Sequence, residues 1–438
     1  MPSYPEVTLG DVNAPRKADM FALFGPPMDF QVYYGAGKTL AEGGSVYDQC
    51  VMTSNWGQGW CLPFTYPPFA AWLASLYSKL SFEGAVFIWQ TMSLLIFAVV
   101  LGAIIFERAS RLSLGKIAFL IILLVATFAF SPARSSFYWG QVNMLIVGLV
   151  AVDFLRAERW ASVRENGWRD DRWYAGIVVG LAAAIKVSPA FFGLMFLLQK
   201  RWRAAIVSGV TFFITVVLGF LMVPEAGKFW VDTLTDTSRF SGMDNVTSQS
   251  IQIALQREFG IDSTLLWALL AVLVTVLTSL GAWYCLRAGN RAVALSIVGI
   301  AACIISPFSW HHYYLWVITL SVAAGVIFVD VLRNYLRDTL AFPLGALIGF
   351  AGGAAIAATC VVALWPYVSI VFFYSFDVYH LARSSNPFVA SVTVWWSLLL
   401  IALTTVVAWR VLNAQARLAQ SRSELPDVGH IRARHSAE

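Results

Sequence analysis

The sequence predicts an all-α polytopic membrane protein, and three observations support this fold class. Of its 438 residues, 58% are hydrophobic and 13% are charged, and the mean hydropathy is +0.68. Soluble domains carry roughly 25% charged residues. Apolar runs long enough to cross a bilayer recur along the chain, with loops rich in Lys and Arg between them. The net charge of +5 is modest, so membrane lipids are the expected surroundings and no nucleic acid is expected as a partner.

Apolar windows of roughly 17–25 residues identify the spans. They are expected at 84–106, 116–131, 139–155, 203–223, 264–286, 291–307, 312–332, 340–365 and 391–410. Placing the loops rich in Lys and Arg in the cytoplasm satisfies the positive-inside rule throughout. The segments that then become extracytoplasmic are 131–139, 224–262, 306–312 and 366–390.

A further apolar stretch, 173–199, begins and ends on the cytoplasmic side in this topology. Lys186 and Pro189 interrupt it, so we expect a short hairpin or a pair of broken helices instead of one span. Discontinuous helices with a charged residue at the break usually line a cavity. Alternatively, Lys186 could extend its side chain to the cytoplasmic surface.

Residues 1–83 are expected to form an extracytoplasmic first loop, because the span at 84–106 has to run inwards. Within this loop, residues 67–81 are short for a span and predict an interfacial helix with Trp and Tyr near the headgroups. The total is about eleven spans with the C-terminus inside. This odd number predicts that a span preceding Asp29 is missing from the sequence. Residues 84–410 then form the transmembrane bundle, and 411–438 a disordered cytoplasmic tail.

The cysteines fall into two groups. Cys285, Cys303 and Cys360 lie in predicted spans and are expected to be small buried hydrophobic residues. Cys50 and Cys61 lie close together in the polar first loop, where their spacing would allow a disulfide without requiring one.

Four polar clusters fall on the extracytoplasmic side in this topology. Their members are Asp29 and Tyr66; Arg134, Gln141 and Asn143; Asn245, Gln249, Ser250 and Arg257; and Ser309, Trp310, His311 and His312. Polar groups at the mouth of a membrane helix are costly unless they face water, a partner or a ligand. Their convergence on one side of the membrane predicts a functional site there.

Three of these clusters also have an explanation that involves no ligand. Asp29 could cap the N-terminus of a helix at 30–40. The adjacent histidines could belong to an interfacial aromatic belt. Gln141 and Asn143 could join helices through hydrogen bonds.

The chain from Asp29 to about Arg410 resembles glycosyltransferase family 87, because several short motifs occur in the order seen in that family. They are Asp29-Phe-x-Val-Tyr33, Tyr66-Pro-Pro, Gly140-Gln-Val-Asn143, Lys186-x-x-Pro189, Gln249-Ser250 and Ser306-Pro-x-Ser-Trp-x-His312. Its members are integral membrane enzymes of the GT-C superfamily, typified by actinobacterial polyprenol-phosphate-mannose-dependent α-1,2-mannosyltransferases. The resemblance implies a multi-helix GT-C bundle with extracytoplasmic loops and interfacial helices.

The resemblance also implies roles for individual residues. The acidic residue of the first extracytoplasmic loop, which falls on Asp29, is the catalytic base. The histidine of the Ser-Trp-x-His pattern falls on His312. His311 stands where relatives often have Asp, so the division of labour between the two histidines stays open. Family members carry a span directly before the acidic residue. This agrees with the span that the odd number of crossings predicts before Asp29.

The chemistry of a lipid-phosphate donor fits one carboxylate. A polyprenyl phosphate is already a good leaving group, whereas a glycosidase that expels an alkoxide needs a second carboxylate as acid. Asp29 would take the proton of the acceptor hydroxyl as this hydroxyl attacks C1, and a single displacement predicts inversion. Negative charge then grows on the phosphate and favours cations or hydrogen-bond donors there.

We therefore divide the remaining candidates by the part of the substrate that they suit. The candidates for the phosphate are His312, Arg134, Arg257 and Lys186. The candidates for sugar hydroxyls are Gln141, Asn143, Tyr66, Gln249 and Ser250, and further substrate contacts are expected from Asn245, His311, Ser309 and Trp310. The first loop contains no Asp-x-Asp pair, so neither a metal nor a cofactor is expected. Asp232 and Asp236 in a later loop are the alternative for a metal.

The sequence predicts an inverting glycosyltransferase of the plasma membrane with an extracytoplasmic active site. By resemblance, the donor is polyprenyl-phosphate-mannose, and the acceptor is a mannosylated glycolipid such as a phosphatidylinositol mannoside, lipomannan or lipoarabinomannan, joined through an α-1,2 linkage. A polyprenyl-phosphate-arabinose-dependent arabinofuranosyltransferase of the cell envelope is the alternative within this class. A lipid-linked sugar flippase or transporter should show two related halves, and the sequence shows none.

Overall fold

The computed structural model describes residues 27–48, 51–53, 61–106, 114–128, 130–155, 173–234, 248–339 and 391–423. In these residues the regular structure is helical apart from one small antiparallel sheet, in which β1 (Met52–Thr53) pairs with β2 (Cys61–Leu62). The predicted all-α class is therefore confirmed.

Several helices are long and apolar enough to cross a membrane. They are α3 (Phe82–Phe106), α9 (Trp202–Met222), α11 (Thr264–Arg287) and the Thr393–Arg417 part of α17 (Val392–Ser423). In α9 only 17% of the most apolar window is buried, and in α11 only 22%. These helices therefore present most of their apolar surface outwards, as expected where lipid replaces water. The protein is a multi-pass membrane protein.

A bent pair of helices would add one more crossing. Helices α4 (Leu114–Thr127) and α5 (Ser131–Tyr138) pass the same test together, but they meet at an angle of 81°. Helix α4 covers the expected span at 116–131 only as far as Thr127, and the break follows it. Pro132 at the start of α5 explains the break, because proline is tolerated in the first turn of a helix but not inside one.

Two expected spans are shorter than a bilayer crossing. The window at 139–155 contains α6 (Asn143–Phe154), and the window at 291–307 contains α12 (Arg291–Ile305). Both helices are largely buried inside the bundle, so their apolar character reflects packing against protein. The window at 312–332 falls in α13 (Leu315–Thr339) apart from its first three residues, and the one at 340–365 lies outside the described residues.

The expected break in 173–199 is confirmed. Helix α7 (Ile177–Ile185) ends at Lys186, whose backbone is extended with φ −150° and ψ 129°. A 3-10 turn, η2 (Ser188–Phe192), and α8 (Gly193–Leu198) follow.

Helix α7 lies in direct backbone contact with α9. A Cβ on Gly180 would come within 2.6 Å of the Ser208 carbonyl oxygen, and one on Gly176 within 2.1 Å of that of Ala204. The position of the break at Lys186 is therefore fixed against a membrane-spanning helix.

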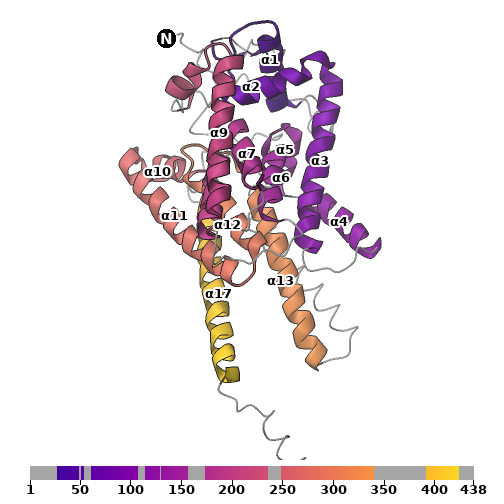
Figure 1. Ribbon diagram of the computed structural model, residues 1–438, viewed down its shortest axis with the longest axis vertical. Helices are drawn as coiled ribbons and strands as arrows, with labels where there is room; N and C mark the ends of the chain where they lie inside the picture. The colour runs from indigo at the N-terminus through magenta and orange to yellow at the C-terminus, as the bar shows by residue number, and fades with distance from the viewer. Residues whose placement is uncertain are drawn as a thin grey trace, which may run out of the picture.

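Two short helical segments pack on α1 (Met28–Ala41) at one end of the bundle, which we call the α1 end (Figure 1). They are α2 (Pro68–Ser75) and η1 (Leu76–Lys79), and together they account for the helix expected at 67–81. A Cβ on Gly37 would lie 2.3 Å from the Ala74 carbonyl oxygen, so α1 and α2 touch backbone to backbone. Helices α13 and α17 extend furthest at the opposite end (Figure 1).

Helix α17 continues further than the sequence suggested. It reaches Ser423, whereas 411–438 was expected to be a disordered tail. Residues 411–423 are rich in Ala, Leu, Gln and Arg, which favour helix even where nothing packs on them. Residues 1–26 and 424–438 lie outside the described part of the chain, so the expectation of a preceding span stays a prediction.

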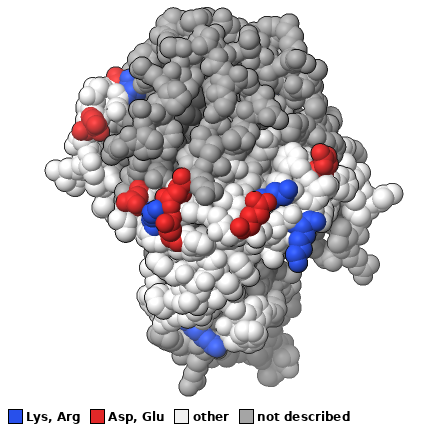
Figure 2. Space-filling view, turned by 90° about the horizontal axis from the view of Figure 1, so that it is seen from above, with Lys and Arg blue, Asp and Glu red and all other residues white. Residues whose placement is uncertain are grey.

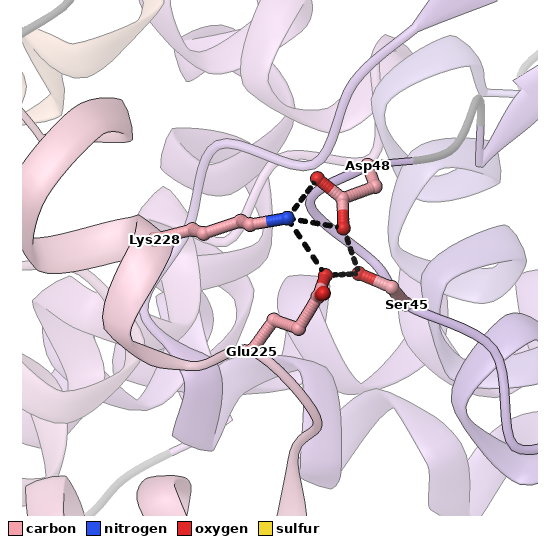
Figure 3. Close-up of polar contacts among 4 residues, drawn as sticks. All are labelled: Ser45, Asp48, Glu225 and Lys228. Carbon is pink, nitrogen blue, oxygen red and sulfur yellow. Dashed lines mark hydrogen bonds and ion pairs between the residues drawn. The ribbon is translucent and has the colours of Figure 1, made fainter.

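An exposed group at the α1 end joins the turn after α1 to the turn after α9 (Figure 3). The Lys228 Nζ lies 2.5 Å from Asp48 Oδ1 and 3.0 Å from Glu225 Oε2. The Ser45 hydroxyl donates to Glu225 Oε2 at 2.7 Å. We call these four residues the Lys228 cluster. Seen from this end, basic and acidic side chains stand next to one another in small groups separated by uncharged surface (Figure 2).

The remaining short elements connect these helices. After the Lys228 cluster comes the π-helical turn η3 (Phe229–Thr233). Helix α10 (Ile251–Phe259) precedes α11, and the 3-10 turn η5 (His311–Tyr313) lies between α12 and α13.

Candidate functional site

The candidate site is built at the start of α1. Pro27 is the N-cap of this helix and Asp29 lies in its first turn, so the capping role considered for Asp29 is wrong. The Trp139 carbonyl oxygen accepts hydrogen bonds from the backbone N–H groups of Asp29 and Phe30, at 3.0 and 3.2 Å. Gly140, at φ +67°, permits this approach, because a Cβ there would lie 2.7 Å from that of Phe30.

Gln141 comes next in the chain and its side chain reaches Asp29. Its Nε2 donates to Asp29 Oδ2 at 2.5 Å. Its Oε1 lies 3.3 Å from the hydroxyl oxygens of Tyr33 and of Tyr66, which are 2.8 Å apart. A hydroxyl has one proton to donate, so Tyr33 donates to Tyr66 and Tyr66 donates to Gln141. The structure thus brings together Asp29, Gln141 and Tyr66, as the sequence predicts, and adds Tyr33.

Lys186 enters the same region from the break after α7. Its Nζ lies 3.3 Å from Asn143 Oδ1 and 3.1 Å from the centroid of the Tyr313 ring, which is a cation–π contact. An extended side chain at the cytoplasmic surface is therefore wrong for Lys186. In the described part of the chain, Lys186 forms no ion pair with a carboxylate.

A cavity of about 30 Å³ lies beside Lys186. Asn143, Lys186, Ser188, Ser309 and Tyr313 form the polar part of its wall. This volume suits water rather than a sugar. The cavity is therefore one polar part of the site and not the whole site.

The two histidines tie η5 to α5 and α6. His311 Nε2 lies 3.0 Å from Ser135 Oγ. The His312 carbonyl oxygen accepts hydrogen bonds from Ser136 Oγ at 3.2 Å and from Asn143 Nδ2 at 3.1 Å. Both histidines are 5% exposed, so their assignment to a surface aromatic belt is wrong. The interhelical hydrogen bonds considered for Asn143 are present.

The His312 ring itself stacks on Trp310, with centroids 6.1 Å apart and planes at 16°. Neither ring nitrogen has a hydrogen-bond partner among the described residues. Burial lowers the pKa of His312 well below its usual range, and the charges of His311 and Lys186 act in the same direction. The imidazole is therefore neutral at physiological pH and offers a substrate an N–H donor, not a positive charge.

The segment from Ser248 is bound to the stretch 306–314. The Gln249 N–H donates to the Ser309 carbonyl oxygen at 2.5 Å, and Ser250 Oγ donates to that of Pro307 at 3.0 Å. Ser250 also caps α10. The Tyr314 hydroxyl donates to the Gln249 carbonyl oxygen at 2.8 Å. In each of the bonds between the two segments, the acceptor is a backbone carbonyl oxygen. Together they join two parts of the site that are far apart in sequence.

The two arginine candidates differ in their surroundings. Arg257 donates to the Ser248 carbonyl oxygen at 3.1 Å and to Ser391 Oγ, so it connects α10 to the start of α17. Arg134 on α5 is partly buried, and one of its guanidinium nitrogens, Nη2, has no partner among the described residues. The structure records no contact between Arg134 and Asp29. Asn245 lies outside the described residues.

The structure describes only some of the residues that were considered for a metal site or a disulfide. Among the described residues, no group of three or more His, Cys, Asp or Glu is arranged to hold a metal ion. Asp232 lies in η3 and Asp236 outside the described residues. Cys285 and Cys303 are buried as expected. The possible partners Cys50 and Cys61 cannot be compared, because Cys50 lies outside the described residues.

Burial gives Asp29 the proton affinity of a base. The surrounding chain raises the pKa of Asp29 to about 6, although the hydrogen bond from Gln141 and the charge of Lys186 both lower it. Part of the Asp29 side chain stays exposed. A carboxylate with a pKa near the working pH takes up and releases a proton readily, which is the property that general base catalysis requires.

Some contributing residues were not found from the sequence. Tyr33 follows Asp29 by four positions and so lies on the same face of α1, a spacing that could have identified it. Tyr313 is adjacent to His312, yet its role under the Lys186 ammonium depends on the fold.

Asp153 was also missed. It lies 5% exposed on α6, and its carboxylate accepts hydrogen bonds from the backbone N–H groups of Gly176 and Val179 at 3.1 and 3.2 Å. These donors belong to the start of α7, the helix that ends at Lys186. Arg201 donates to the Asp153 carbonyl oxygen at 3.1 Å. Helix α6 therefore holds α7 at its start through Asp153 and at its end through Asn143.

The fold and this site define a polytopic membrane protein with a polar site around a carboxylate, Asp29, and the sequence comparisons give its family. Residues 64–307, more than half of the chain, match glycosyltransferase family 87. The protein belongs to this family and is a membrane glycosyltransferase that uses a lipid-linked sugar.

Curated relatives with related names extend the comparison. The chain is 31% identical over 297 residues to the polyprenol-phosphate-mannose-dependent α-(1-2)-phosphatidylinositol pentamannoside mannosyltransferase of Mycolicibacterium smegmatis, covering 67% of this chain and 68% of the relative. It is 30% identical over 314 residues to the polyprenol-phosphate-mannose-dependent α-(1-2)-phosphatidylinositol mannoside mannosyltransferase of Mycobacterium tuberculosis, covering 68% and 70%.

A more distant relative has a different sugar in its name. The α-(1->3)-arabinofuranosyltransferase of Corynebacterium glutamicum is 22% identical over 413 residues, covering 92% of this chain and 86% of the relative. No solved structure matches the chain.

Proposed function

We propose that the protein transfers mannose from polyprenyl-phosphate-mannose to a mannosylated glycolipid at the extracytoplasmic face of the plasma membrane, forming an α-1,2 linkage with inversion. The acceptor would be a phosphatidylinositol mannoside, lipomannan or lipoarabinomannan. The observation that carries this proposal is Asp29, a carboxylate with a raised pKa, partly exposed and held by Gln141. The names of the two mycobacterial relatives support the choice of sugar and acceptor.

The proposed reaction is a single displacement. Asp29 takes the proton of the acceptor hydroxyl while the oxygen of that hydroxyl bonds to C1 of the sugar. The bond from C1 to the phosphate oxygen breaks, and its electron pair leaves with the polyprenyl phosphate. A phosphate leaving group needs no acid, so one carboxylate suffices. Among the described residues, no other carboxylate contributes to the pKa of Asp29.

Lys186 suits the phosphate of the donor. A buried charge is unfavourable unless it is paired, and among the described residues the ammonium group of Lys186 contacts the Asn143 side-chain oxygen and the Tyr313 ring but no carboxylate. A phosphate at this position would supply the opposite charge and place C1 near Asp29. His312 would add a neutral N–H donor to the same group, which is a form of stabilisation that strengthens as charge grows on the leaving oxygen.

Arabinofuranosyl transfer from polyprenyl-phosphate-arabinose is the second candidate. The observation in its favour is the length of the match, because the corynebacterial relative covers 92% of the chain. The higher identity of the mannosyltransferases favours mannose. A flippase or transporter has no support, since the chain belongs to a family of transferases.

The test is sugar transfer by membranes that contain the full chain. Labelled polyprenyl-phosphate-mannose and polyprenyl-phosphate-arabinose are supplied separately with a phosphatidylinositol mannoside acceptor, and the new linkage is assigned by NMR. We expect mannose transfer that Asp29→Asn abolishes and Glu42→Gln preserves, since Glu42 lies exposed at the far end of the same helix. Undiminished transfer by Asp29→Asn at equal expression would contradict the proposal, and use of arabinose alone would select the second candidate.

A further inference from the structure

We infer that Gln141 is the positioning residue of the base, and that the hydroxyls of Tyr33 and Tyr66 fix the orientation of its amide. This inference rests on the proposed function of Asp29. It also changes the roles expected of Gln141 and Tyr66, because both were assigned to the sugar hydroxyls from the sequence.

The first step concerns the two ends of the Gln141 side chain. A carboxamide has a donor end and an acceptor end, and an ionised carboxylate only accepts. Gln141 therefore supports ionised Asp29 only when Nε2 faces it, as in the observed contact. The reversed amide would set Oε1 against the Asp29 oxygen and would favour the protonated acid instead.

The second step concerns what prevents this reversal. The Tyr66 hydroxyl offers its proton to Gln141 Oε1 and accepts that of Tyr33. The two tyrosine rings meet edge to face, with centroids 5.0 Å apart and planes at 89°. Gln141 and Tyr33 are 5% and 6% exposed and Tyr66 is half-buried, so the Gln141 and Tyr33 ends of these bonds are shielded from water. Because Tyr66 donates its proton to Gln141, the Gln141 oxygen faces Tyr66 and the Gln141 nitrogen faces Asp29.

The third step concerns the placement of Tyr66. Its carbonyl oxygen accepts a hydrogen bond of 2.8 Å from the Tyr47 hydroxyl. In the sequence, Tyr47 lies between Ser45 and Asp48 of the Lys228 cluster. Tyr33 shares α1 with Asp29, and Tyr66 immediately precedes α2. The two tyrosines that orient the Gln141 amide are thus held by separate parts of the chain, Tyr33 by α1 and Tyr66 by the segment before α2.

The fourth step concerns capacity for other bonds. The Tyr66 proton is committed to Gln141 Oε1, and a hydroxyl has one proton to give, so Tyr66 keeps none to donate to a sugar hydroxyl. The observed side-chain contacts of Gln141 are with Asp29 at its donor end and with the tyrosine hydroxyls at its acceptor end. The contacts support a role in holding Asp29 more directly than a role in holding the sugar.

The test is the dependence of kcat/KM on pH, measured on the purified full chain with whichever of the two donors the wild type uses. The charged or titratable groups that face Asp29 are Lys186, Tyr33, Tyr66 and Tyr313. Burial keeps the pKa values of the three tyrosines well above their usual range, so they stay neutral. In the plot of kcat/KM against pH, deprotonation of Lys186 affects the alkaline limb. The acidic limb reports the pKa of Asp29.

We expect Gln141→Met to move the acidic limb of kcat/KM to higher pH by about one unit, because the hydrogen bond that favours ionised Asp29 is lost. Tyr66→Phe and Tyr33→Phe should move it in the same direction by less, with the acceptor KM unchanged. Tyr34→Phe is the matched control. Tyr34 is also on α1, but its hydroxyl donates to the Leu80 carbonyl oxygen, so the limb should stay in place.

The outcomes separate this inference from the proposed function. A raised acceptor KM with an unmoved limb in Gln141→Met and Tyr66→Phe would overturn the inference and restore these residues to sugar binding. If Asp29→Asn retains full activity, the proposed base itself is wrong. Should Gln141→Met fail to fold, as judged by gel filtration in detergent, the limb in Tyr33→Phe decides alone, because that variant removes a single oxygen atom.

Discussion

Asp29 and Asp153 are both enclosed aspartates, yet their hydrogen-bond donors differ in kind. The Asp153 carboxylate accepts from two backbone N–H groups, those of Gly176 and Val179, and is 5% exposed. Asp29 accepts from a side-chain amide, that of Gln141, and stays partly exposed. Backbone donors at a helix start cannot rotate away, so Asp153 is held permanently. The comparison teaches that a structural carboxylate is enclosed by backbone donors, whereas a carboxylate that can exchange a proton is held by a side chain and keeps part of its surface open.

The largest expected effect is on catalysis at Asp29. Asn at position 29 keeps the shape and the contact with Gln141 but cannot take a proton, so kcat should fall by about 10²–10⁴-fold. The thermal unfolding temperature should stay close to that of the wild type. Product formation per mole of folded protein is the measurement, and Asp153→Asn is the comparison. Equal losses of kcat in the two variants would remove the distinction between the two carboxylates.

The second effect is on stability at Asp153. Ala at position 153 leaves the buried N–H groups of Gly176 and Val179 without their acceptor, at about 1–3 kcal/mol each. The free energy of unfolding should fall by about 2–4 kcal/mol, as measured by denaturation in detergent. Asp262→Ala removes an exposed carboxylate before α11 and should change stability little. If both alanine variants unfold alike, the capping of α7 by Asp153 is unimportant.

The third effect is on the pH dependence that separates a reactive carboxylate from an inert one. Asp29 must be ionised to act, so kcat/KM should rise with pH towards about 6. Burial lowers the pKa of Lys186 to about 7, so kcat/KM should fall again above that pH as Lys186 loses its charge. The positive charge of Lys186 lowers the pKa of Asp29. Lys186→Met should therefore raise that pKa and move the acidic limb to higher pH. An acidic limb that Lys186→Met leaves in place would show that the two groups do not interact.

The smallest effect is expected at the Lys228 cluster, which is connected to Asp29 indirectly, through the hydrogen bond from Tyr47 to the Tyr66 carbonyl oxygen. Lys228 and its partners are about 40% exposed, and such surface pairs contribute roughly 0–1 kcal/mol. Lys228→Met should lower kcat by less than about threefold at low salt. The difference from wild type should vanish near 1 M salt, where charges are screened within about 3 Å. A loss that persists at high salt would indicate packing instead of charge.

The sequence predicted the convergence at the site better than the geometry within it. Topology alone placed Asp29, Gln141 and His312 on one side of the membrane, and the fold brings their elements into contact. The charge state of His312 was not predictable, because it depends on how deeply the ring is enclosed between Trp310 and its neighbours. The N-cap expectation for Asp29 failed because proline took the cap position and moved the aspartate into the first turn.

The membrane spans illustrate the same limit. The windows at 139–155 and 291–307 are apolar enough for a crossing, but helices α6 and α12 are shorter because they pack inside the bundle. Hydropathy does not distinguish an apolar surface that meets lipid from one that meets protein. Asp153 was overlooked for a related reason, since nothing in the sequence indicates that the start of α7 lies against it.

The length of α6 has a consequence for where water reaches the protein. Asn143 and Asp153 lie ten positions apart on this helix, which corresponds to about 15 Å along its axis. A hydrocarbon core is about 30 Å thick, so the two polar ends of α6 cannot stand at opposite surfaces of a bilayer. If α6 lies at membrane depth, at least one of its polar ends is surrounded by other parts of the protein and not by bulk water. Hydration of that end is then set by the packing of the bundle and not by the thickness of the membrane around it.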